Sequence, residues 1–385
     1  MAEHVLILNA GSSSVKFALY SDQPAPQEIT GGMVEGIGDA LLLDIEGRSS
    51  KIRARQGTPD HTGAVAMILE YLQQAFEALT IKAVGHRIVH GGMNFTKPAK
   101  LTGDVISQLE TLAPFAPLHQ MQNIAGVAAA QKAFPDAVQY GCFDTSFHRQ
   151  HPWVHDAYGL PRSYYDEGVR RYGFHGLSYE YIHSELQRTN SELANGRIVI
   201  AHLGNGASLC AMKDGISTAS TMGFSPLDGL PMGTRCGQID PGALLYLMDQ
   251  KGLDADEITQ ILYYQSGLKG LSGISRDMRK LLASDSADAI QAVDYFIAHT
   301  EREIGGMVAT IGGIDGLIFT GGIGENARSI RARICQDLNW LGAEIDDERN
   351  QANEQVISTD KSPLKIMVIP TNEELTIARK AKLFI

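Results

Sequence analysis

The stretch that decides the fold lies near the N-terminus and reads Ile7-Leu-Asn-Ala-Gly-Ser-Ser-Ser-Val-Lys-Phe17. Apolar residues lead into one glycine and three hydroxyls, and β-branched, aromatic and apolar residues surround Lys16, so the pattern predicts a strand, a tight turn and a second strand. The stretch is not a P-loop, because that motif has two glycines, a Ser or Thr directly after its lysine, and a helix after its loop. A polar hairpin tip with Ser12, Ser14 and Lys16 fits a phosphate, but it fits an ordinary solvated turn equally well.

The second half of the chain opens in the same way. It reads Arg197-Ile-Val-Ile-Ala-His-Leu-Gly-Asn-Gly-Ala-Ser-Leu-Cys-Ala-Met-Lys213, again a strand, a glycine turn and a strand. The dipeptide Asp214-Gly215 then predicts a turn into a third strand. Two halves with the same opening indicate a duplication around a central cleft. Two facing glycine turns can hold the phosphates of one nucleotide from opposite sides, which favours phosphate binding at the N-terminal hairpin.

Strands and helices alternate along the rest of the chain, which predicts an α/β protein. A chain of 385 residues is too long for one ordinary core, so we expect two domains. Strands are expected at residues 4–9, 15–20, 28–35, 83–90, 137–143, 197–203, 208–213, 216–220, 316–320 and 365–370. Helices are expected near residues 64–79, 104–112, 122–133, 241–251, 255–264, 287–310, 325–338 and 372–382.

Composition and charge restrict the class of protein. The chain is 44% hydrophobic and 20% charged, as in ordinary globular proteins, and its net charge of −11 argues against a broad nucleic-acid surface. The N-terminal residues lack the basic segment of a signal peptide, and no apolar segment is long enough to span a bilayer. The cysteines form no C-x-x-C pair, so we expect a reduced, cytoplasmic protein without a zinc knot, disulfides, or a membrane partner. They are Cys142, Cys210, Cys236 and Cys335.

A third glycine loop reads Gly316-Leu-Ile-Phe-Thr-Gly-Gly-Ile-Gly-Glu-Asn-Ala327. An apolar strand, glycines and a following helix are typical of phosphate binding, because glycines let a ligand approach the backbone and a helix start offers free amide donors. The predicted helix also carries Arg328, Arg331 and Arg333. A glycine-rich turn kept for packing has a similar sequence, so the presence of three such loops in one chain carries the argument.

Two arginines and one histidine lie in glycine-rich surroundings. Arg87 lies in a strand-like run that ends in paired glycines, and Arg235 lies in a loop without apolar periodicity. A guanidinium group has a planar fork of donors that fits phosphate and carboxylate, although pairing with a protein carboxylate is the plainer alternative. His175, between an aromatic residue and a glycine, is either a donor at a site or a hydrogen-bonded core histidine. His86 and His90 would lie roughly 13 Å apart on a strand, too far to share zinc.

The motifs resemble, in order along the chain, those of the acetate kinase family. The likeness covers essentially the whole chain, and an ordered set of motifs is far more specific than any single glycine loop. The motifs are Asn9-Ala-Gly-Ser-Ser-Ser-Val-Lys16, Gly85-His-Arg-Ile-Val-His-Gly-Gly92, Ala116-Pro-Leu-His119, Phe143-Asp-Thr-Ser-Phe-His148, Tyr172-Gly-Phe-His-Gly176, His202-Leu-Gly-Asn-Gly-Ala-Ser208, Met232-Gly-Thr-Arg235, Phe319-Thr-Gly-Gly-Ile-Gly-Glu-Asn326 and Thr371-Asn-Glu-Glu-Leu375.

The resemblance implies a duplicated actin-like ATPase fold, as in sugar kinases and heat-shock ATPases, with two domains around a nucleotide cleft. The implied N-terminal domain covers residues 1–147, and the implied C-terminal domain covers 148–373 and carries most of the nucleotide site. The C-terminal helix, 374–385, is expected to pack on the first domain. The implied activity is the reversible, Mg²⁺-dependent transfer of the γ-phosphoryl group of ATP to acetate, giving acetyl phosphate and ADP, with Mn²⁺ as an alternative metal. The family likeness also implies a homodimer.

Carried over position by position, the resemblance implies a catalytic set of five residues. Arg87 and Arg235 would flank acetate and the moving phosphoryl group, and His175 would donate to the equatorial oxygens of that group. His119 would lie nearby, and Asp144 matches the family's essential acidic residue.

Metal, acceptor and nucleotide contacts are implied in the same way. The implied metal ligands are Asn9 and Glu373. The acceptor's methyl group would lie among Val89, Leu118, Phe174 and Pro226. The implied nucleotide contacts are Ser12, Ser14, Lys16, His202, Leu203, Gly204, Asn205, Gly206, Asp277, Met278, Arg279, Gly322, Ile323, Gly324, Glu325 and Asn326.

The chemistry of this reaction agrees with the residues present. A sugar kinase must remove a proton from a hydroxyl, whereas a carboxylate at neutral pH has already lost its proton and attacks directly. The enzyme instead needs positive charge to bring two anions together. We therefore expect that Asp144 is not a general base and that it holds the metal's water shell or orients an arginine. Because Val89 leaves little room for a longer acid, propionate is expected to be a poorer substrate than acetate.

Some positions depart from the family's pattern. Gln120-Met121 stands where Asn-Pro is usual, Leu177-Ser-Tyr179 where Thr-Ser-His is usual, and Cys236-Gly-Gln238 where Ser-Gly-Asp is common. These residues adjoin the implied site, so the departures concern its supporting contacts. Other functions stay open: a propionate or butyrate kinase, an actin-like ATPase that needs no carboxylic acid, and a glycine-rich binding protein without nucleotide affinity.

Overall fold

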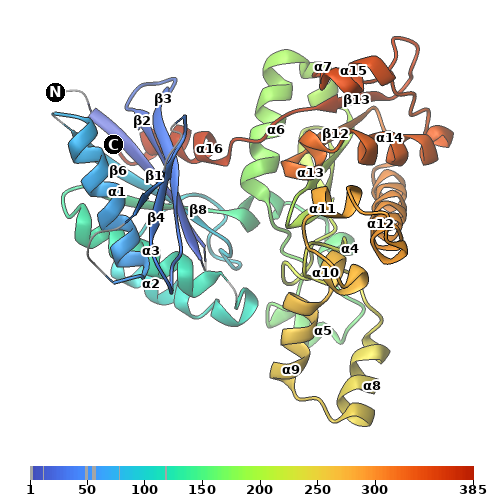
Figure 1. Ribbon diagram of the computed structural model, residues 1–385, viewed down its shortest axis with the longest axis horizontal. Helices are drawn as coiled ribbons and strands as arrows, with labels where there is room; N and C mark the ends of the chain where they lie inside the picture. The colour runs from blue at the N-terminus through green and yellow to red at the C-terminus, as the bar shows by residue number, and fades with distance from the viewer. Residues whose placement is uncertain (1–2, 12, 48–50, 54–57, 78, 118) are drawn as a thin grey trace. The chain divides into compact units, whose positions relative to one another are not determined.

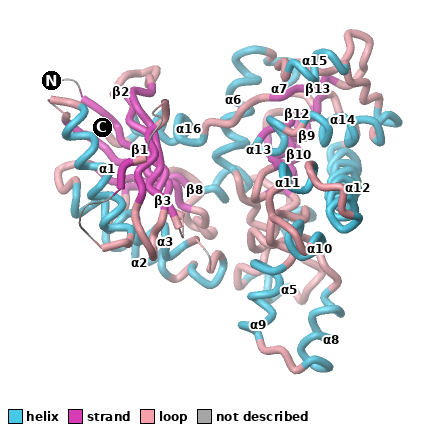
Figure 2. The backbone as a smooth tube through the Cα atoms, in the orientation of Figure 1, coloured by secondary structure: helices cyan, strands magenta, loops and turns pink. Residues whose placement is uncertain are grey.

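The structure is a computed structural model that describes residues 3–11, 13–47, 51–53, 58–77, 79–117 and 119–385. The chain divides into two compact units, each with one β-sheet and its own helices (Figures 1 and 2). Unit 1 comprises residues 1–149, 176–181 and 372–385, and unit 2 comprises residues 150–175 and 182–371. The domain boundaries after residues 147 and 373 that the family resemblance implies stay a prediction.

The strands of unit 1 form a single mixed sheet. They are β1 (Glu3–Ala10), β2 (Ser14–Ser21), β3 (Glu28–Glu35), β4 (Leu42–Ile45), β5 (Ile52–Arg53), β6 (Thr80–Ile88), β7 (Ala99–Lys100) and β8 (Val138–Phe143). Their order is β5-β4-β3-β2-β1-β6-β8-β7. Strands β1, β2 and β3 are an antiparallel meander, and β6 and β8 continue the sheet in parallel with β1. The predicted N-terminal hairpin is thus confirmed, and Asn9 pairs with Lys16 across it.

Helices cover both faces of this sheet because successive side chains of a strand point to opposite sides. Leu6 and Leu8 of β1 belong to the core under α1 (His61–Ala75) and α3 (Gln120–Ala133). Val5 and Ile7, which alternate with these leucines along β1, belong to the core under α16 (Glu373–Lys380) on the other face. Helix α2 (Gly103–Glu110) packs against α3. The C-terminal helix therefore joins the N-terminal sheet, although most of the chain lies between them in sequence.

Unit 2 repeats the central part of that sheet. Its strands are β9 (Arg197–Leu203), β10 (Ala207–Lys213), β11 (Ile216–Ser220), β12 (Gly316–Thr320) and β13 (Lys365–Val368). Their order is β11-β10-β9-β12-β13, with an antiparallel meander followed by two parallel strands. The order corresponds strand for strand to β3-β2-β1-β6-β8 of unit 1. The two similar stretches that open the two halves of the sequence thus fold into two similar meanders.

The longest helix of unit 2 is α12 (Ala287–Ile311), whose buried stripe packs on β9, β10 and β11. It begins after Ser286 and is followed by Gly312, whose φ of 75° is readily adopted by glycine. The other helices are α4 (Trp153–Asp156), α5 (Arg162–Asp166), α6 (Gly176–Thr189), α7 (Ser191–Ala194), α8 (Pro241–Lys251), α9 (Ala255–Gln260), α10 (Gly267–Ser272), α11 (Met278–Leu282), α13 (Gly321–Asn326), α14 (Arg328–Asp337) and α15 (Asp347–Ala352). The first residues of α6 belong to unit 1.

Several element boundaries differ from the sequence-based expectation. The strand expected to end at His90 ends at Ile88, and the helix expected at 325–338 is two helices, α13 and α14, that meet at Ala327. The helix expected at 255–264 is α9, which widens into a π-helical turn at Ile261–Gln265. The short strands β4, β5 and β7, at and near the edges of the sheet, were not expected. Within the described part of the chain, every helix is too short or too polar to cross a membrane.

Candidate active site

In unit 1 the proposed site residues gather at the carboxyl ends of β6 and β8. These strands are parallel neighbours, so Arg87 near the end of β6 and Asp144 directly after β8 reach the same edge of the sheet. The Arg87 guanidinium donates from Nε to Asp144 Oδ1 at 3.0 Å and from Nη2 to Oδ2 at 2.7 Å. Its Nη1 lies 3.3 Å from Oε2 of Glu373, the first residue of α16. Residues far apart in sequence thus form one charged cluster.

Burial controls the electrostatics of this cluster. Asp144 is 1% exposed, whereas the Arg87 side chain is 19% exposed and so remains reachable. Burial by itself disfavours the charge of Arg87, but Asp144 and Glu373 outweigh that effect and raise its pKa above the ordinary value. Burial raises the pKa of Glu373 to about 7, against the opposing effect of Arg87. Burial therefore favours the neutral form of this carboxyl group, whereas a cation beside it favours the charged form.

The glycine hairpin of unit 1 also faces a carboxylate. Lys16 Nζ lies 3.0 Å from Oε1 of the buried Glu374, and this partner raises the pKa of Lys16 despite the opposing effect of burial. The tip of the hairpin is closed by the Gly11 N–H, which donates to the carbonyl of Ser14. Ser12 lies outside the described residues.

Two buried amides from α3 support the segment around Arg87 through contacts that no sequence pattern predicts. Asn123 accepts from the N–H of Val89 at 2.9 Å and donates to the carbonyl of Ala10 at 2.7 Å, so it ties β1 to the segment after β6. Gln120 donates to the carbonyl of His90 and accepts from its N–H. Gln120 is one of the departures from the family's pattern, and it is completely buried in this supporting position.

The remaining unit 1 residues lie close to these supports. Val89 is 8% exposed, and His119 is the residue directly before α3. Leu118 lies outside the described residues. His86 is a core residue: its Nε2 lies 2.8 Å from Gln139 Oε1, and burial lowers its pKa to about 4. Among the described residues, no group of three or more His, Cys, Asp and Glu side chains is arranged to hold a metal ion.

In unit 2 a second cluster forms around the turn between β9 and β10. A Cβ atom on Gly206 would lie 2.9 Å from Arg235 Nη2 and 3.2 Å from His175 Nε2, so these two nitrogen atoms converge over the glycine backbone. The His175 ring stacks on the His202 ring with 4.2 Å between centroids. Arg235 Nη1 donates to the carbonyl of Pro226 at 2.6 Å. Glycine at position 206 leaves room for these two side chains, because a Cβ there would crowd both.

The loop that carries Arg235 is fixed on both sides by the π-helical turn. Thr234 donates from Oγ1 to the carbonyl of Tyr263 at 2.8 Å, and the N–H of Cys236 donates to the carbonyl of Leu262 at 3.0 Å. A wider helical turn changes the local backbone hydrogen bonding and is frequent at functional sites. Here the carbonyls of the turn accept hydrogen bonds from both neighbours of Arg235, so the backbone that carries the guanidinium group is held on both sides.

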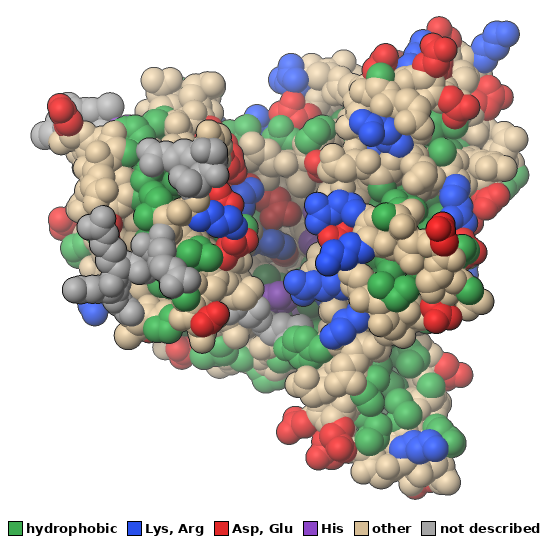
Figure 3. Space-filling view, in the orientation of Figure 1, with side chains coloured by type: hydrophobic (Ala, Val, Ile, Leu, Met, Phe, Trp, Pro, Cys, Tyr) green, Lys and Arg blue, Asp and Glu red, His purple; other side chains and the backbone are tan. Residues whose placement is uncertain are grey.

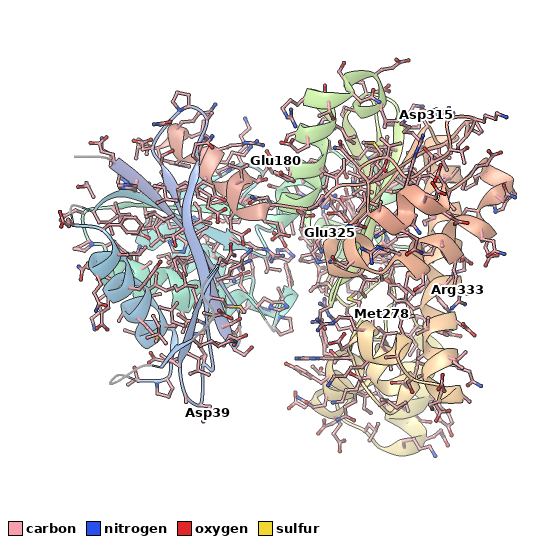
Figure 4. All side chains as sticks on the ribbon, turned by 45° about the horizontal axis from the view of Figure 1, so that its top comes forward. Asp39, Glu180, Met278, Asp315, Glu325 and Arg333 are labelled. Carbon is pink, nitrogen blue, oxygen red and sulfur yellow. The ribbon has the colours of Figure 1, made fainter. Side chains whose placement is uncertain are left out.

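The third glycine loop differs from its sequence-based interpretation. Gly322, Ile323 and Gly324 lie within the short helix α13 instead of in an open loop. Glu325 accepts at Oε1 from the N–H groups of Gly321 and Thr371, and Asn326 donates to the carbonyl of Gly322. Figure 4 labels Glu325 on α13. The side chains of both Glu325 and Asn326 thus hold the shape of the loop itself.

Arg331 is not available to an anion, in contrast to what its place after the glycines indicated. It is completely buried and donates to the carbonyls of Gly324, Glu325 and Asn350 and to the side-chain oxygens of Asn350 and Asn353. Burial lowers its pKa to about 10. Arg331 therefore acts as a brace that joins α13 to α15.

Arg331→Met should destabilise the fold by about 3 kcal/mol or more, because several buried carbonyl and amide oxygens lose their donor. Arg333→Ala on the same helix is the matched control, since Arg333 makes an exposed pair with Asp294 at 2.7 Å and should contribute less than about 1 kcal/mol. Figure 4 labels Arg333. Urea unfolding followed by circular dichroism measures both changes. Equal midpoints for the two variants would contradict the bracing role.

The residues implied as adenosine contacts lie at the start of α11. Asp277 precedes the helix and accepts from the N–H of Arg279, and the Arg279 guanidinium also pairs with its carboxylate at 2.6 Å. Arg279 lowers the pKa of Asp277 to about 2. The Arg279 side chain is 90% exposed, whereas Met278 is buried. The remaining residues, Phe174, Leu203 and the glycine Gly204, line the core and turn of unit 2 near His175 and His202.

The chain is similar to known proteins over nearly its whole length. The model of the Acetokinase family matches residues 4–379. An acetate kinase of Methylocella silvestris is 50% identical over 392 residues, which cover 98% of this chain and 97% of that protein. An acetate kinase of Rhodopseudomonas palustris is 45% identical, with 98% of each chain covered. The crystal structure of Porphyromonas gingivalis acetate kinase matches with a TM-score of 0.89 and 36% identity over 99% of each chain. That of a propionate kinase from Francisella tularensis matches with a TM-score of 0.90 and 36% identity over 98% of each.

Proposed function

Because the chain belongs to the acetokinase family, we propose that it transfers the γ-phosphoryl group of ATP to the carboxylate of acetate, reversibly, giving acetyl phosphate and ADP. The observation that best supports this chemistry is the convergence of Arg235 Nη2 and His175 Nε2 over the Gly206 backbone. Phosphoryl transfer depends on positioning and on positive charge around the moving group, which these donors supply. An ionised acetate needs no base, so no residue is assigned to that role.

Each catalytic residue has a proposed part. Arg235 and His175 donate to the equatorial oxygens of the transferring group, and Arg87 binds the acetate carboxylate. Asp144 holds the Arg87 guanidinium in one orientation, which its two short hydrogen bonds support. His119 contacts the acceptor side of the site. Lys16 and Ser14 of the first hairpin, the second hairpin at 202–206 and the loop at 322–326 bind the phosphates, and residues 277–279 contact adenosine.

The residues also fit Mg²⁺, or Mn²⁺ in its place. Magnesium prefers oxygen ligands and is usually held by one or two carboxylates, substrate phosphates and water. Glu373, with a carboxylate that is 13% exposed, and Asn9 near the hairpin tip offer such oxygens. Bound Mg²⁺ would neutralise charge on the phosphate oxygens. The raised pKa of Glu373 fits a place where a cation is expected to bind.

We also propose that the protein forms a homodimer through α8. This helix has no buried residue in the single chain, and Leu245, Tyr246 and Met248 are 66%, 52% and 48% exposed. Figure 3 shows hydrophobic side chains gathered over the part of unit 2 that contains α8 and α9. An apolar helix surface of this kind is typical of an interface between subunits. The cytoplasmic location and the absence of nucleic-acid partners stay predictions from the sequence.

A direct assay tests the proposed activity. The protein is incubated with MgATP, hydroxylamine and one carboxylic acid, and the hydroxamate that forms from an acyl phosphate is measured. We expect product with acetate. Hydrolysis of ATP that does not depend on any acid would instead support the ATPase switch, and no product with any short acid would contradict the kinase proposal.

The size of the acceptor pocket gives a quantitative prediction. If the buried Val89 lies against the methyl group of acetate, propionate should have a kcat/KM roughly 10- to 200-fold lower, the usual effect of one methylene in an apolar pocket. Val89→Ala should then raise the ratio of propionate to acetate. Val84→Ala, on β6 shortly before Val89 but in the core under α1, should leave the ratio unchanged. Equal kcat/KM for acetate and butyrate would contradict the pocket, and a preference for propionate would favour a propionate kinase.

A further inference from the structure

A buried serine supports the histidine of the unit 2 cluster. Ser208 lies on β10, directly opposite His202 in the strand register, and it is completely buried. Its Oγ lies 2.8 Å from Nδ1 of His175. The His175 ring thus has a hydrogen bond at one edge and the stacked His202 ring on one face, at an interplanar angle of 22°. These contacts leave Nε2 as the nitrogen that points toward the Gly206 turn, as the distance of 3.2 Å to a Cβ there indicates.

We propose that Ser208 is a positioning residue that fixes both the orientation and the tautomer of His175. A neutral imidazole carries one proton, on either Nδ1 or Nε2, and the partner of one nitrogen decides where the proton resides. In this proposal the Ser208 hydroxyl donates to Nδ1 across the 2.8 Å contact, and the proton of the ring resides on Nε2. The ring then presents an N–H donor to the Gly206 turn, beside Arg235. This inference rests on the proposed function, in which that N–H donates to the transferring phosphoryl group.

The backbone of His175 makes the side-chain support necessary. His175 has a φ of 56°, in the left-handed region that few residues other than glycine adopt. The imidazole ring has no capping hydrogen bond to α6, the helix that follows it. Its direction therefore depends on contacts to the ring itself, among them the 2.8 Å contact of Ser208 with Nδ1, which distinguishes the two nitrogen atoms. An alanine at position 208 would remove this contact.

The chain contains a matched control for this pair. Ser217 on β11 is also buried, and its Oγ lies 2.8 Å from Nε2 of His151. Both pairs lie in unit 2 and use a serine of the same sheet, but Ser217 takes no part in the proposed site. Removing the Ser217 hydroxyl therefore reproduces the loss of a buried serine–histidine hydrogen bond without affecting the chemistry.

The experiment compares wild-type protein, Ser208→Ala, Ser208→Thr and Ser217→Ala, all full length. Histidine ¹⁵N NMR on labelled protein reports which ring nitrogen is protonated, and His175→Asn identifies the resonances of His175, since Asn tolerates a positive φ. In the wild type we expect an unprotonated Nδ1 and a protonated Nε2. Ser208→Ala should lose this pattern and lower kcat roughly 10- to 100-fold with little change in the KM for ATP, a typical effect of an orienting partner. Ser208→Thr should restore both, and Ser217→Ala should change neither.

Three results would overturn the proposal. They are a protonated Nδ1 in the wild type, a kcat of Ser208→Ala within twofold of the wild type, and equal losses in Ser208→Ala and Ser217→Ala. The last would mean that the hydroxyl matters only for folding. A wild-type protein without acyl phosphate activity would contradict the proposed function instead, because the NMR pattern tests the tautomer without any turnover.

Discussion

Asp144→Asn is expected to lower kcat/KM for acetate at least roughly 100-fold while the protein remains folded. The Arg87 guanidinium donates twice to the Asp144 carboxylate, which is 1% exposed. An amide keeps only one acceptor oxygen and turns an NH₂ group toward a guanidinium nitrogen, so one of the two hydrogen bonds is lost. Arg87 would then be held mainly by Glu373, 3.3 Å from its Nη1, and would no longer be directed toward a bound carboxylate. Steady-state kinetics with acetate measures the loss.

A second bidentate pair in the same chain serves as the control. Arg197 donates to both oxygens of Asp315, at 3.1 and 2.6 Å, but the two side chains are about 40% exposed and lie outside the proposed site. Asp315→Asn should therefore leave kcat/KM unchanged and affect stability by less than about 1 kcal/mol. Nearly full turnover in folded Asp144→Asn would contradict both the orienting role of Asp144 and its place in the catalytic set.

Arg235→Ala is expected to lower kcat by roughly 100- to 1,000-fold, the usual consequence of removing one donor to a charge that develops in the transition state. Arg235→Lys should recover little of this loss. The present guanidinium donates to the carbonyl of Pro226 with Nη1 while Nη2 faces Gly206, and a single ammonium group cannot reproduce that planar fork. Single-turnover measurements with saturating ATP and acetate separate the chemical step from binding.

Arg302→Ala is the appropriate comparison for Arg235. The exposed Arg302 donates to the side chain of Gln238, three residues after Arg235, at 2.7 Å. Its loss should leave the single-turnover rate within about twofold, because it alters only the outer side of the same loop. A similar rate loss in both variants would mean that disturbance of the loop, and not the missing donor, explains the effect.

Much of the fold follows from patterns that the sequence displays. The strand, glycine turn and strand at residues 7–17 and its repeat at 197–213 predicted the two meanders, and the duplicated actin-like fold is confirmed by the matching strand orders and by the solved relatives. The signal is strong because each hairpin is local: apolar strands and a glycine turn lie within a few residues of one another. The strands β4, β5 and β7 give no such signal because they are only four, two and two residues long.

The site was predictable only in part. Arg87 and Arg235 are conspicuous by their glycine-rich surroundings, but Asp144 is a single acid after a strand, and only the parallel pairing of β6 with β8 brings it to Arg87. Gln120 and Asn123 look like solvated positions of a helix, because nothing local shows that α3 turns them toward the backbone of other segments. Their placement depends on contacts between residues far apart in the chain, which periodicity does not encode.

Arg331 illustrates the opposite error. Its position shortly after a glycine loop is typical of phosphate binding, yet α13 and α14 meet at Ala327 and turn the guanidinium inward. The glycines that were expected to form an open loop instead form helical turns, and the carbonyl ends of those turns need a donor. The short distance in sequence therefore correctly indicated a contact between Arg331 and the glycine loop. That contact holds the loop in shape and is not phosphate binding.

His175 is the last residue of its stretch of unit 2, and the chain enters unit 1 at the next peptide bond. Glu373 likewise follows soon after the later passage between residues 371 and 372. A change in the backbone torsion angles at these junctions also changes the direction of the His175 imidazole and the Glu373 carboxylate, which lie next to them. A substitution that changes the backbone at either junction is therefore expected to change the direction of the His175 or Glu373 side chain as well.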